Sequence, residues 1–383
     1  MLRVAHICTA ASMYKLLVDK LTILKGYGYD IDLISSDEGY NEELMKHYDF
    51  DIKFIHINRE INLIDDIKSI YNLVKLLNKE KYDIVHTHNA KAGIVGRIAG
   101  KIAKIPVVIH TSHGLPFYKG QKKVKFHLYK FIEKIGSFFC DAIGSQNLED
   151  LDLIRNYITK KRTYYEGNGV DVERLYKLEK NIDKNTIQSL KSNLGISDST
   201  KVILVGARFE PIKGHEFLLQ GLYVLKQKYK PDFVCLLAGR GNLQEKIQSK
   251  INELGLNNEV KIIGYKTDLY PYIKLADLIV LTSKKEGIPR ILMESMAFSK
   301  PVVATDVLGT RELVKNTTGF LVPFNDQKQL AEKIMLLLND KGLRKKFGYN
   351  AYKLIEKEFT ESIVAGRIDS IYKEILSRKG VDL

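Results

Sequence analysis

Proline is scarce in this sequence, with 8 prolines among 383 residues. Hydrophobic residues make up 45% of the chain and charged residues 28%, a composition typical of folded globular proteins and not of long disordered linkers. We therefore expect the whole chain to fold. Because a domain usually holds roughly 100 to 200 residues, a chain of this length is expected to form two domains.

Long hydrophobic segments are also missing. No apolar run approaches the roughly 18 residues that cross a bilayer, which argues against a spanning helix but leaves attachment to a membrane surface open. The first residues, MLRVAHICTA, lack the basic segment, apolar stretch and cleavage site of a secretory signal. We therefore expect a cytoplasmic protein that is either free or peripheral on the inner face of the cell membrane.

Cysteine is rare, and acidic residues are fewer than basic ones. Cys8, Cys140 and Cys235 have spacings that match no metal knuckle or redox pair, so buried thiols are expected. The 60 lysines and arginines exceed the 46 acidic residues and give a net charge of +14. This charge suits nucleic acid, an anionic membrane or an anionic substrate. Nucleic acid is the weakest of the three and is not expected as a partner, because no helix-turn-helix, zinc-finger, RNA-recognition or KH signature is present.

Short β-forming runs alternate with helical patterns along the chain. Each run is bounded by polar residues or glycine, as in parallel strands that are covered on both faces. The pattern predicts an α/β protein with two doubly wound, Rossmann-like domains that face each other across a cleft. The expected strands are residues 2–8, 29–35, 50–57, 82–88, 201–207, 232–239, 260–265, 277–283 and 300–305, and the expected helices include 64–81, 215–229 and 243–254.

The domain boundaries follow from the point where this pattern restarts, after residue 200. We expect an N-terminal domain over residues 1–180 and a C-terminal domain over 181–361. The polar segment from Gly167 to Asp198 is interpreted as the connection. By analogy with similar two-domain folds, a C-terminal helix at about 362–383 is expected to cross back to the first domain.

Two glutamates flank the start of a predicted helix, with seven residues between them. If this helix begins near Pro289, its first backbone N–H groups form a site for anions or hydroxyl groups. Glu286 would then lie just before the helix and accept hydrogen bonds from sugar hydroxyls, while Glu294 would lie about two turns into it. Paired carboxylates near a helix start also serve as caps or solvated surface, so the spacing alone leaves both interpretations open.

The context of these glutamates carries a family resemblance. From Ser283 to Val314 the chain has Ser-x-x-Glu-Gly, then Glu-Ser-Met-Ala, then Lys-Pro-Val-Val-Ala-Thr-Asp and Gly-Thr-Arg-Glu-Leu-Val. This order strongly resembles family 4 of the glycosyltransferases, in particular the enzymes that build capsules, exopolysaccharides and O-antigens. The resemblance covers nearly the whole chain, and it implies that the first domain lies on the acceptor side and that the second binds the nucleotide sugar. It implies the GT-B fold and a retaining hexosyltransferase that moves a sugar from a nucleotide diphosphate sugar, expected to be a UDP-sugar, to a lipid-linked saccharide.

The resemblance also implies roles for particular residues near the two glutamates. Glu286 would contact the hydroxyls of the donor sugar, and Glu294 would hold the ribose. Many relatives have Gly-Phe-Gly after the first glutamate, whereas this chain has Gly-Ile-Pro-Arg, and the departure puts the identity of the sugar in doubt. The backbone contacts to sugar and phosphate would come from Gly287, Ile288, Pro289 and Arg290.

A candidate cationic pair follows the expected strand at 201–207. Breaking a nucleotide sugar expels a diphosphate, and fixed cations stabilise the negative charge that develops on the leaving group. Arg208 and Lys213 have suitable chemistry and match the family's Gly-Arg-x-x-x-x-Lys-Gly pattern, although two cations in a surface loop are common in so basic a chain. Because such a pair can replace a divalent ion and no Asp-x-Asp triplet is evident, we expect neither a required metal nor another cofactor.

Further donor contacts are implied by the resemblance with less support from the residues themselves. The nucleotide base is expected near the end of the strand at 260–265, and a diphosphate contact is possible where two alanines replace a Gly-Gly loop of many relatives. Arg240 departs from an acidic residue of the family and either alters these contacts or lies in a solvated turn. The residues concerned are Gly264, Tyr265, Lys266, Ala10 and Ala11.

Histidines cluster where two N-terminal strands end. Four histidines without a carboxylate or cysteine at ligand spacing are poor evidence for zinc, and no metal site is expected. The resemblance points to His113 as the residue that reaches the donor sugar, whereas His86 and His110 are expected to be satisfied structural groups. No nucleophilic carboxylate stands beside His113 in the sequence. We therefore hypothesise that the leaving phosphate accepts the acceptor's proton on the same face of the sugar, with His113 and Glu286 positioning it.

Residues 119–134, KGQKKVKFHLYKFIEK, form a basic segment with interleaved apolar residues. A helix of this composition either lies on an anionic bilayer or packs on its own domain with its lysines in water. Two other functions remain as alternatives to the transferase: a nucleotide-sugar epimerase with a similar fold, and a sensor that binds the donor without turnover. A dinucleotide oxidoreductase is disfavoured because no strand leads into G-x-G-x-x-G.

Overall fold

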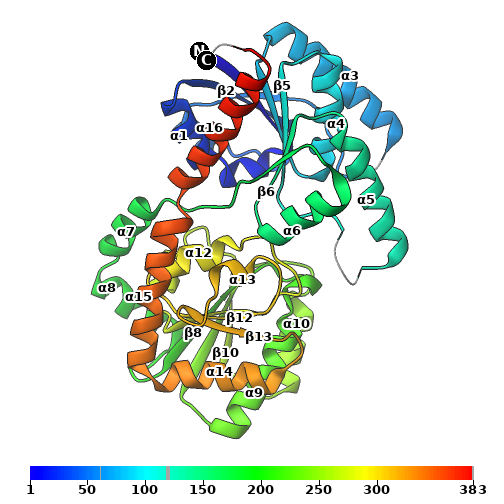
Figure 1. Cartoon of the computed structure of the whole chain (residues 1–383). Coiled ribbons are helices and arrows are strands. Elements are labelled where there is room, and N and C mark those ends of the chain that lie inside the picture. The colour runs from blue at the N-terminus through cyan, green and yellow to red at the C-terminus, as the bar shows by residue number, and fades with distance from the viewer. Residues whose placement is uncertain (61, 118–120, 382–383) are drawn as a thin grey trace. The chain divides into compact units, whose positions relative to one another are not determined.

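The computed structural model describes residues 1–60, 62–117 and 121–381. The chain divides into two compact units, residues 1–168 with 361–383 and residues 169–360 (Figure 1). Each unit has one parallel sheet, which confirms the prediction of two Rossmann-like α/β domains. Among the described residues, no helix combines the length and apolar character needed to cross a membrane.

The first unit is built on a seven-stranded sheet with the order β3-β2-β1-β4-β5-β6-β7. The order reverses between β1 and β4, and in such sheets ligands bind beyond the carboxyl ends of the strands that flank the reversal. The loops after these strands begin at Ala11 and Asn89. The strands are β1 Leu2–Ala10, β2 Tyr29–Ser36, β3 Asp51–Phe54, β4 Ile84–His88, β5 Val107–Ser112, β6 Ala142–Ser145 and β7 Arg162–Tyr165.

Helices cover both faces of this sheet. The C-terminal helix α16 packs on α1 and buries Ile368 and Tyr372 against the core of the first unit (Figure 1). The C-terminal end of the chain therefore contributes side chains to the core of the N-terminal unit. The helical elements are the 3-10 helix η1 Ala11–Leu16, α1 Val18–Gly26, α2 Glu42–Tyr48, α3 Leu63–Glu80, α4 Ala90–Ile102, α5 Lys123–Ser137, α6 Leu148–Leu153, the π-helical turn η2 Ile154–Ile158 and α16 Glu361–Arg378.

The second unit has a six-stranded sheet with the order β10-β9-β8-β11-β12-β13. Its order reverses between β8 and β11, which pair directly. The loops after these two strands carry the candidate cations and the candidate glutamates, so the sheet brings both motifs to its reversal point. The strands are β8 Lys201–Gly206, β9 Phe233–Ala238, β10 Val260–Gly264, β11 Leu278–Leu281, β12 Val302–Thr305 and β13 Gly319–Val322.

The helices of the second unit include two in the segment that was expected to be a connection. They are α7 Val172–Asn181, α8 Lys184–Leu194, the 3-10 turn η3 Pro211–Lys213, α9 His215–Tyr229, α10 Gln244–Glu253, α11 Tyr270–Leu275, α12 Arg290–Ala297, α13 Thr310–Leu313, α14 Gln327–Asn339 and α15 Lys341–Glu358.

The interpretation of Gly167 to Asp198 as a mere connection is wrong, because α7 and α8 fill most of it. Side-chain caps from Asp171 and Asp183 start the two helices, and buried Leu175 joins the core of the second unit. The segment is polar on average, and this average hid the helical spacing of the apolar residues in two amphipathic helices. For the same reason the units divide between residues 168 and 169, before α7, and not at the expected boundary of 180.

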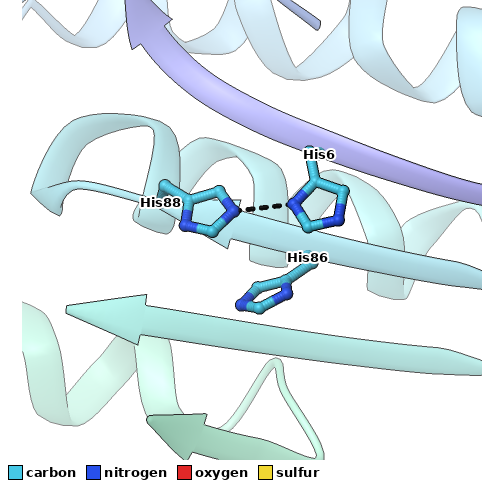
Figure 2. A group of neighbouring side chains, drawn as sticks. All are labelled: His6, His86 and His88. Carbon is cyan, nitrogen blue, oxygen red and sulfur yellow. Dashed lines mark hydrogen bonds between the residues drawn. The ribbon is translucent and has the colours of Figure 1, made fainter. Parts of the chain in front are cut away.

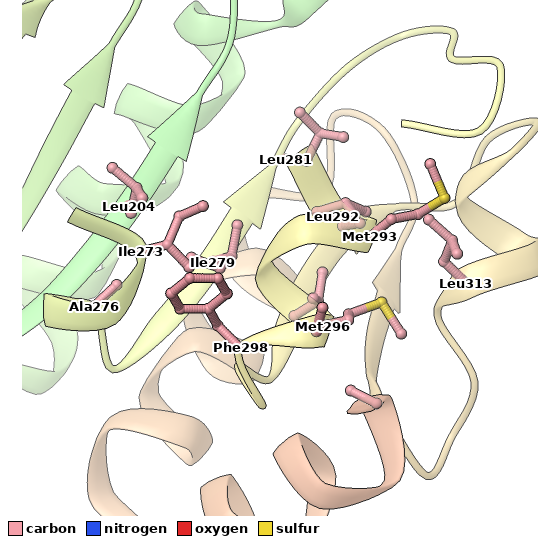
Figure 3. Packing of buried hydrophobic residues seen from close by; sticks show 14 of the residues in the cluster. Leu204, Ile273, Ala276, Ile279, Leu281, Leu292, Met293, Met296, Phe298 and Leu313 are labelled. Atoms are coloured by element: carbon pink, nitrogen blue, oxygen red, sulfur yellow. The ribbon is translucent and has the colours of Figure 1, made fainter. Parts of the chain in front are cut away.

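Helix α12 is anchored by one of the apolar clusters in the second unit. Leu292, Met293 and Met296 on the helix pack with Leu281 of β11 and Leu204 of β8 (Figure 3). All five side chains are buried, so the interior fixes the helix against the sheet. The polar residues at the start of α12 are therefore held by a rigid base.

Candidate functional site

The loops after β8 and β11 meet through an ion pair. Lys213 Nζ lies 2.6 Å from Glu286 Oε1, and the Ser283 hydroxyl donates to the same oxygen at 2.5 Å. The two charged side chains are 18% and 10% exposed, so water screens the pair only in part. The structure thus brings together one predicted cation and one predicted carboxylate that are 73 residues apart in the sequence.

Two glycines allow the loops to approach one another. Gly309 has φ +77°, and a Cβ atom at this position would lie 1.1 Å from the carbonyl oxygen of Gly287. Gly214 has φ +67°, and a Cβ there would lie 2.1 Å from the carbonyl oxygen of Thr282. Any side chain would force the backbones apart, so these glycines set the position of the segment that contains Glu286.

Helix α12 begins one residue later than its expected start, at Arg290, because Pro289 is extended with ψ 116°. Glu294 consequently lies just over one turn into the helix, and the expectation of two turns is wrong. Arg290 Nε contacts Glu294 Oε1 at 3.0 Å, which holds this carboxylate near the helix start. The side chain of Ile288 is 4% exposed and belongs to the core, so only its backbone is available to a ligand.

The second predicted cation has a different partner. Arg208 Nη1 contacts Glu210 Oε1 at 2.7 Å, and its side chain is 69% exposed. An ion pair this exposed contributes little to stability, so Arg208 is free to rearrange around a ligand at low cost. Lys213 and Arg208 therefore share one loop, but the structure pairs each with its own carboxylate.

The predicted base-binding segment follows β10, the edge strand of the second sheet. Gly264 has φ +71°, and Tyr265 after it is 54% exposed. Arg240 is exposed, and its guanidinium lies over the Tyr265 ring at 4.7 Å, so this arginine has an aromatic partner at the surface. Lys266 lies over the Tyr272 ring at 5.7 Å.

In the first unit, His113 follows β5 and is partly exposed. Its Nε2 lies 2.9 Å from Nδ1 of buried His88, and His88 Nε2 lies 2.9 Å from Nδ1 of buried His6. Figure 2 shows the His6 and His88 rings joined by this hydrogen bond, with His86 beside them. The predicted sugar-contacting histidine is therefore the outer end of a row of imidazoles.

His86 and His110 are buried and hydrogen-bonded, as a structural role requires. His86 contacts the Tyr372 hydroxyl through Nδ1 and the Thr111 hydroxyl through Nε2, both at 2.7 Å. His110 Nδ1 contacts the Thr87 hydroxyl at 3.0 Å.

Ligand atoms of His6, His86 and His88 lie within 4.8 Å of one another, a spacing that a metal ion could use. All six ring nitrogens of these three residues nevertheless have hydrogen-bonding partners within the protein. We therefore describe the group as a hydrogen-bonded network.

Burial keeps these imidazoles neutral. Desolvation lowers the pKa of His6, His86 and His88 well below its ordinary value, and neighbouring positive charge acts in the same direction on each. The pKa of His113 is lowered to about 4, first by desolvation and then by the charge of Lys20. At neutral pH each ring thus carries one proton and can donate through only one nitrogen.

A buried ion pair lies at the inner end of this network, and sequence reasoning missed it. Lys20 Nζ on α1 contacts Glu166 Oε1 after β7 at 2.8 Å, with both side chains at most 1% exposed. Desolvation raises the pKa of Glu166, but Lys20 and hydrogen bonds, including that from Thr111, outweigh this effect and leave the pKa lowered. The sequence signal for this pair was Lys20 itself, a charged residue among the mostly apolar residues 16–24.

Ala10 and Ala11 are buried at the carboxyl end of β1, where η1 begins. Next to them the first unit has a cavity of about 990 Å³. Its lining includes Thr9 and Ala10 at the end of β1, Asn89 directly after β4 and Lys91 at the start of α4, all near the carboxyl ends of the two strands that flank the reversal of the sheet. The cavity therefore occupies the place where a sheet of this kind binds ligands, and Lys91 in its lining is bonded to Asp66 at 2.6 Å.

Helix α5 covers most of the basic segment predicted at 119–134, of which residues 119 and 120 lie outside the described residues. Phe126 and Tyr129 pack inward on the core. A row of large apolar side chains with helical spacing faces solvent instead, with lysines at 122, 123, 125 and 134 also exposed. This apolar stripe of α5 consists of Val124 (80% exposed), Leu128, Phe131 (61%), Ile135 and Phe138 (65%).

Comparisons with known proteins identify related glycosyltransferases. Residues 3–147 match the family model described as Glycosyl transferase 4-like, and residues 186–354 match the model described as Glycosyl transferases group 1. The chain is 28% identical to the UDP-Gal:alpha-D-GlcNAc-diphosphoundecaprenol alpha-1,3-galactosyltransferase of Escherichia coli, over 93% of this chain and 95% of that protein. It is 29% identical to the capsular polysaccharide biosynthesis glycosyltransferase CapM of Staphylococcus aureus, over 98% and 97%.

Solved structures share the fold. The crystal structure of HepE from Anabaena in complex with UDP-glucose superposes with a TM-score of 0.82 at 20% identity, covering 98% of this chain and all of that one. One family model matches most of the first parallel-sheet unit and the other matches most of the second, and the predicted resemblance is confirmed. The chain belongs to family 4 of the glycosyltransferases and has the GT-B fold.

Proposed function

We propose that this glycosyltransferase is a retaining hexosyltransferase that moves a sugar from a UDP-sugar to a lipid-linked saccharide during synthesis of a bacterial surface polysaccharide. The observation that carries the proposal is the Lys213–Glu286–Ser283 cluster at the reversal point of the second sheet. The name of the Escherichia coli relative supports a lipid-linked acceptor, and that of the Staphylococcus aureus relative supports synthesis of a surface polysaccharide. The HepE complex supports a UDP-sugar.

The proposed division of labour follows the chemistry of each group. Lys213 and Arg208 bind the diphosphate and stabilise the charge that it gains as the glycosidic bond breaks. Glu286 accepts hydrogen bonds from sugar hydroxyls, and Glu294 holds the ribose. Backbone groups at 287–290 contact sugar and phosphate, while Gly264, Tyr265 and Lys266 hold the base and Ala10 and Ala11 approach the diphosphate.

Retention is proposed to proceed without an enzyme-bound sugar. Glu166, the carboxylate in the His113 network, is buried and paired with Lys20, so it is unsuited to attack the anomeric carbon. The leaving phosphate takes the acceptor's proton on the same face of the sugar, and His113 positions the sugar. Because lysine and arginine supply the positive charge, we expect transfer to continue in excess EDTA.

The direct test is donor consumption with a panel of UDP-, GDP- and ADP-sugars and a membrane extract as acceptor. We expect one UDP-sugar to be consumed only when the extract is present, and the product to keep the anomeric configuration of the donor. Binding without turnover on any acceptor would instead favour the sensor, and interconversion of the free nucleotide sugar would favour the epimerase. If no nucleotide sugar binds, the proposal is wrong.

A second proposal concerns where the enzyme works. The apolar stripe of α5, with lysines beside it, has the composition of a helix that docks on an anionic bilayer. A buried ion pair, Arg97–Glu133 at 2.9 Å, fastens α5 to α4, so the stripe is held outward by packing on its other face. Peripheral attachment would bring the enzyme to a lipid-linked acceptor.

We expect the double variant Val124→Asp/Phe131→Asp to bind vesicles that contain anionic lipid at least about 10-fold more weakly, because two apolar side chains no longer enter the bilayer and each contributes about 1.5 kcal/mol or more. Flotation of vesicles with bound protein measures this. Tyr349→Asp changes a comparably exposed aromatic side chain, 62% exposed on α15, and should leave binding unchanged. Equal binding of all three proteins would refute the docking role of α5.

A further inference from the structure

A continuous row of hydrogen bonds joins the buried Lys20–Glu166 pair to His113. From the inside outward it passes through Thr111, His86, Tyr372, His6 and His88. Its members come from β1, β4, β5, α16 and the loops after β5 and β7. His113 alone among these residues is partly exposed. The direction of each hydrogen bond can be worked out from the one before it.

The direction is set at Glu166. This carboxylate is ionised beside Lys20, so it can only accept, and the Thr111 hydroxyl must donate its single proton to it, at 2.5 Å. The Thr111 oxygen then has no proton for its other neighbours. Tyr164, whose oxygen is 2.7 Å away, must donate to Thr111. His86 Nε2, also at 2.7 Å, must do the same.

The next two steps reach the C-terminal helix. Neutral His86 has its only proton on Nε2, so its Nδ1 carries a lone pair. The Tyr372 hydroxyl, 2.7 Å from that Nδ1, must donate to it. Tyr372 has then used its proton, and its oxygen accepts from His6 Nε2 at 3.3 Å. If His6 Nε2 were unprotonated, two lone pairs would face each other in a buried site, which is costly.

The remaining steps run along the row of imidazoles. His6 has its proton on Nε2, so its Nδ1 accepts from His88 Nε2 at 2.9 Å. The Nδ1 of His88 in turn accepts from His113 Nε2 at 2.9 Å. His113 therefore has its proton on Nε2 and a lone pair on Nδ1.

We propose that the buried Lys20–Glu166 pair, acting through this row of hydrogen bonds, fixes His113 as the Nε2–H tautomer and presents Nδ1 as a hydrogen-bond acceptor for a substrate hydroxyl. Glu166, Thr111, His86, Tyr372, His6 and His88 are positioning residues for His113. The logic is that of a buried carboxylate that selects one imidazole tautomer, here with five groups between the carboxylate and the working ring. The ligand assigned to Nδ1 rests on the proposed sugar transfer, whereas the tautomer does not.

One neighbour of His113 could obscure this selection. Gln146 forms a side-chain hydrogen bond with the His113 ring. An amide side chain can turn either its oxygen or its NH₂ group toward a ring nitrogen, so Gln146 follows the tautomer and does not set it.

The tautomer can be measured without any substrate. In protein labelled with ¹⁵N at histidine, His113 of the wild type should show a protonated Nε2 and an unprotonated Nδ1 at neutral pH. Tyr372→Phe removes the link between His86 and His6, and we expect both tautomers of His113 in this variant. Tyr29→Phe is the matched control, because Tyr29 also bonds to α16, through Asp369 at 2.8 Å, but lies outside the row. It should show the wild-type tautomer.

A second variant, Lys20→Met/Glu166→Gln, removes both buried charges together and so leaves neither unpaired. It should also give mixed tautomers, and the Tyr372 variant decides the matter if this one fails to fold. A protonated Nδ1 in the wild type, or an unchanged His113 in Tyr372→Phe, would overturn the proposal.

Transfer assays add a readout that a purely structural role would not match. The rate should fall in proportion to the population of the Nε2–H tautomer, by about twofold if the two forms become equally populated. If the Tyr372→Phe enzyme has mixed tautomers and full activity, a hydrogen bond accepted by His113 Nδ1 does not contribute to the transfer rate. If the tautomers behave as predicted but the wild type consumes no nucleotide sugar, the proposed function is wrong and the proposal that the row of hydrogen bonds fixes the His113 tautomer stands.

Discussion

Replacing Lys213 with alanine is expected to lower the turnover number for sugar transfer by about 100- to 1000-fold, the usual effect of removing one preorganised group that stabilises developing charge. Lys213 is 18% exposed and bonded to Glu286, so its ammonium group is held in place before any ligand arrives. The charge on the leaving diphosphate grows as the bond to the sugar breaks, and the loss should therefore appear in kcat more than in donor affinity. Steady-state kinetics with the donor identified by the panel measures both.

Two controls separate catalysis from folding. Lys284→Ala removes a lysine from the adjoining loop after β11, where its backbone N–H bonds to Ile212. The Lys284 ammonium lies over the Phe324 ring at 5.4 Å, and this variant should retain activity. Lys213→Ala also leaves Glu286 without its ion partner, so its melting temperature must be compared with that of Lys213→Ala/Glu286→Ala. If both Lys213 variants lose stability but keep kcat, the ion pair is structural and the proposed role of Lys213 is wrong.

The alternation of strands and helices was predictable because its signals are local. The helix expected at 215–229 is observed at those residues, because its apolar pattern and the glycine directly before it are both local signals. The site loops were also found at strand ends, because parallel sheets place their ligand-binding loops there. The pairing of Lys213 with Glu286 was not predictable from spacing. It depends on β8 and β11 being neighbours, which only the strand order determines.

The His113 network shows why the rest of the site escaped prediction. Lys20 and Glu166 are 146 residues apart, and Tyr372 reaches His86 from a helix 286 residues away. No local pattern encodes these contacts, which arise only when α1 and α16 pack on the same sheet. Helix α5 shows a related limit: the sequence indicated interleaved apolar residues, but which of them packs inward depends on where α4 lies.

Acidification is expected to destabilise the protein steeply below about pH 6.5, the ordinary pKa of histidine. His6, His86, His88, His110 and His215 are buried, and desolvation lowers the pKa of each in the folded state. Between the lowered and the ordinary pKa, the unfolded chain binds protons that the folded chain does not. Stability therefore falls as pH falls, by up to about 1.4 kcal/mol per pH unit for each buried histidine.

The first unit should be the more sensitive one, because it holds four of these five histidines. In the second unit His215 lies edge-on to Phe209, and burial together with the charge of Lys213 lowers its pKa to about 4. Hydrogen exchange followed by mass spectrometry at pH 7.5, 6.0 and 5.0 can resolve the two units, and protection should be lost first in residues 1–168. His215→Phe should flatten the pH dependence of the second unit alone, whereas replacing exposed His127 with asparagine should change neither unit. Equal acid sensitivity of the two units would mean that the buried histidines do not control this transition.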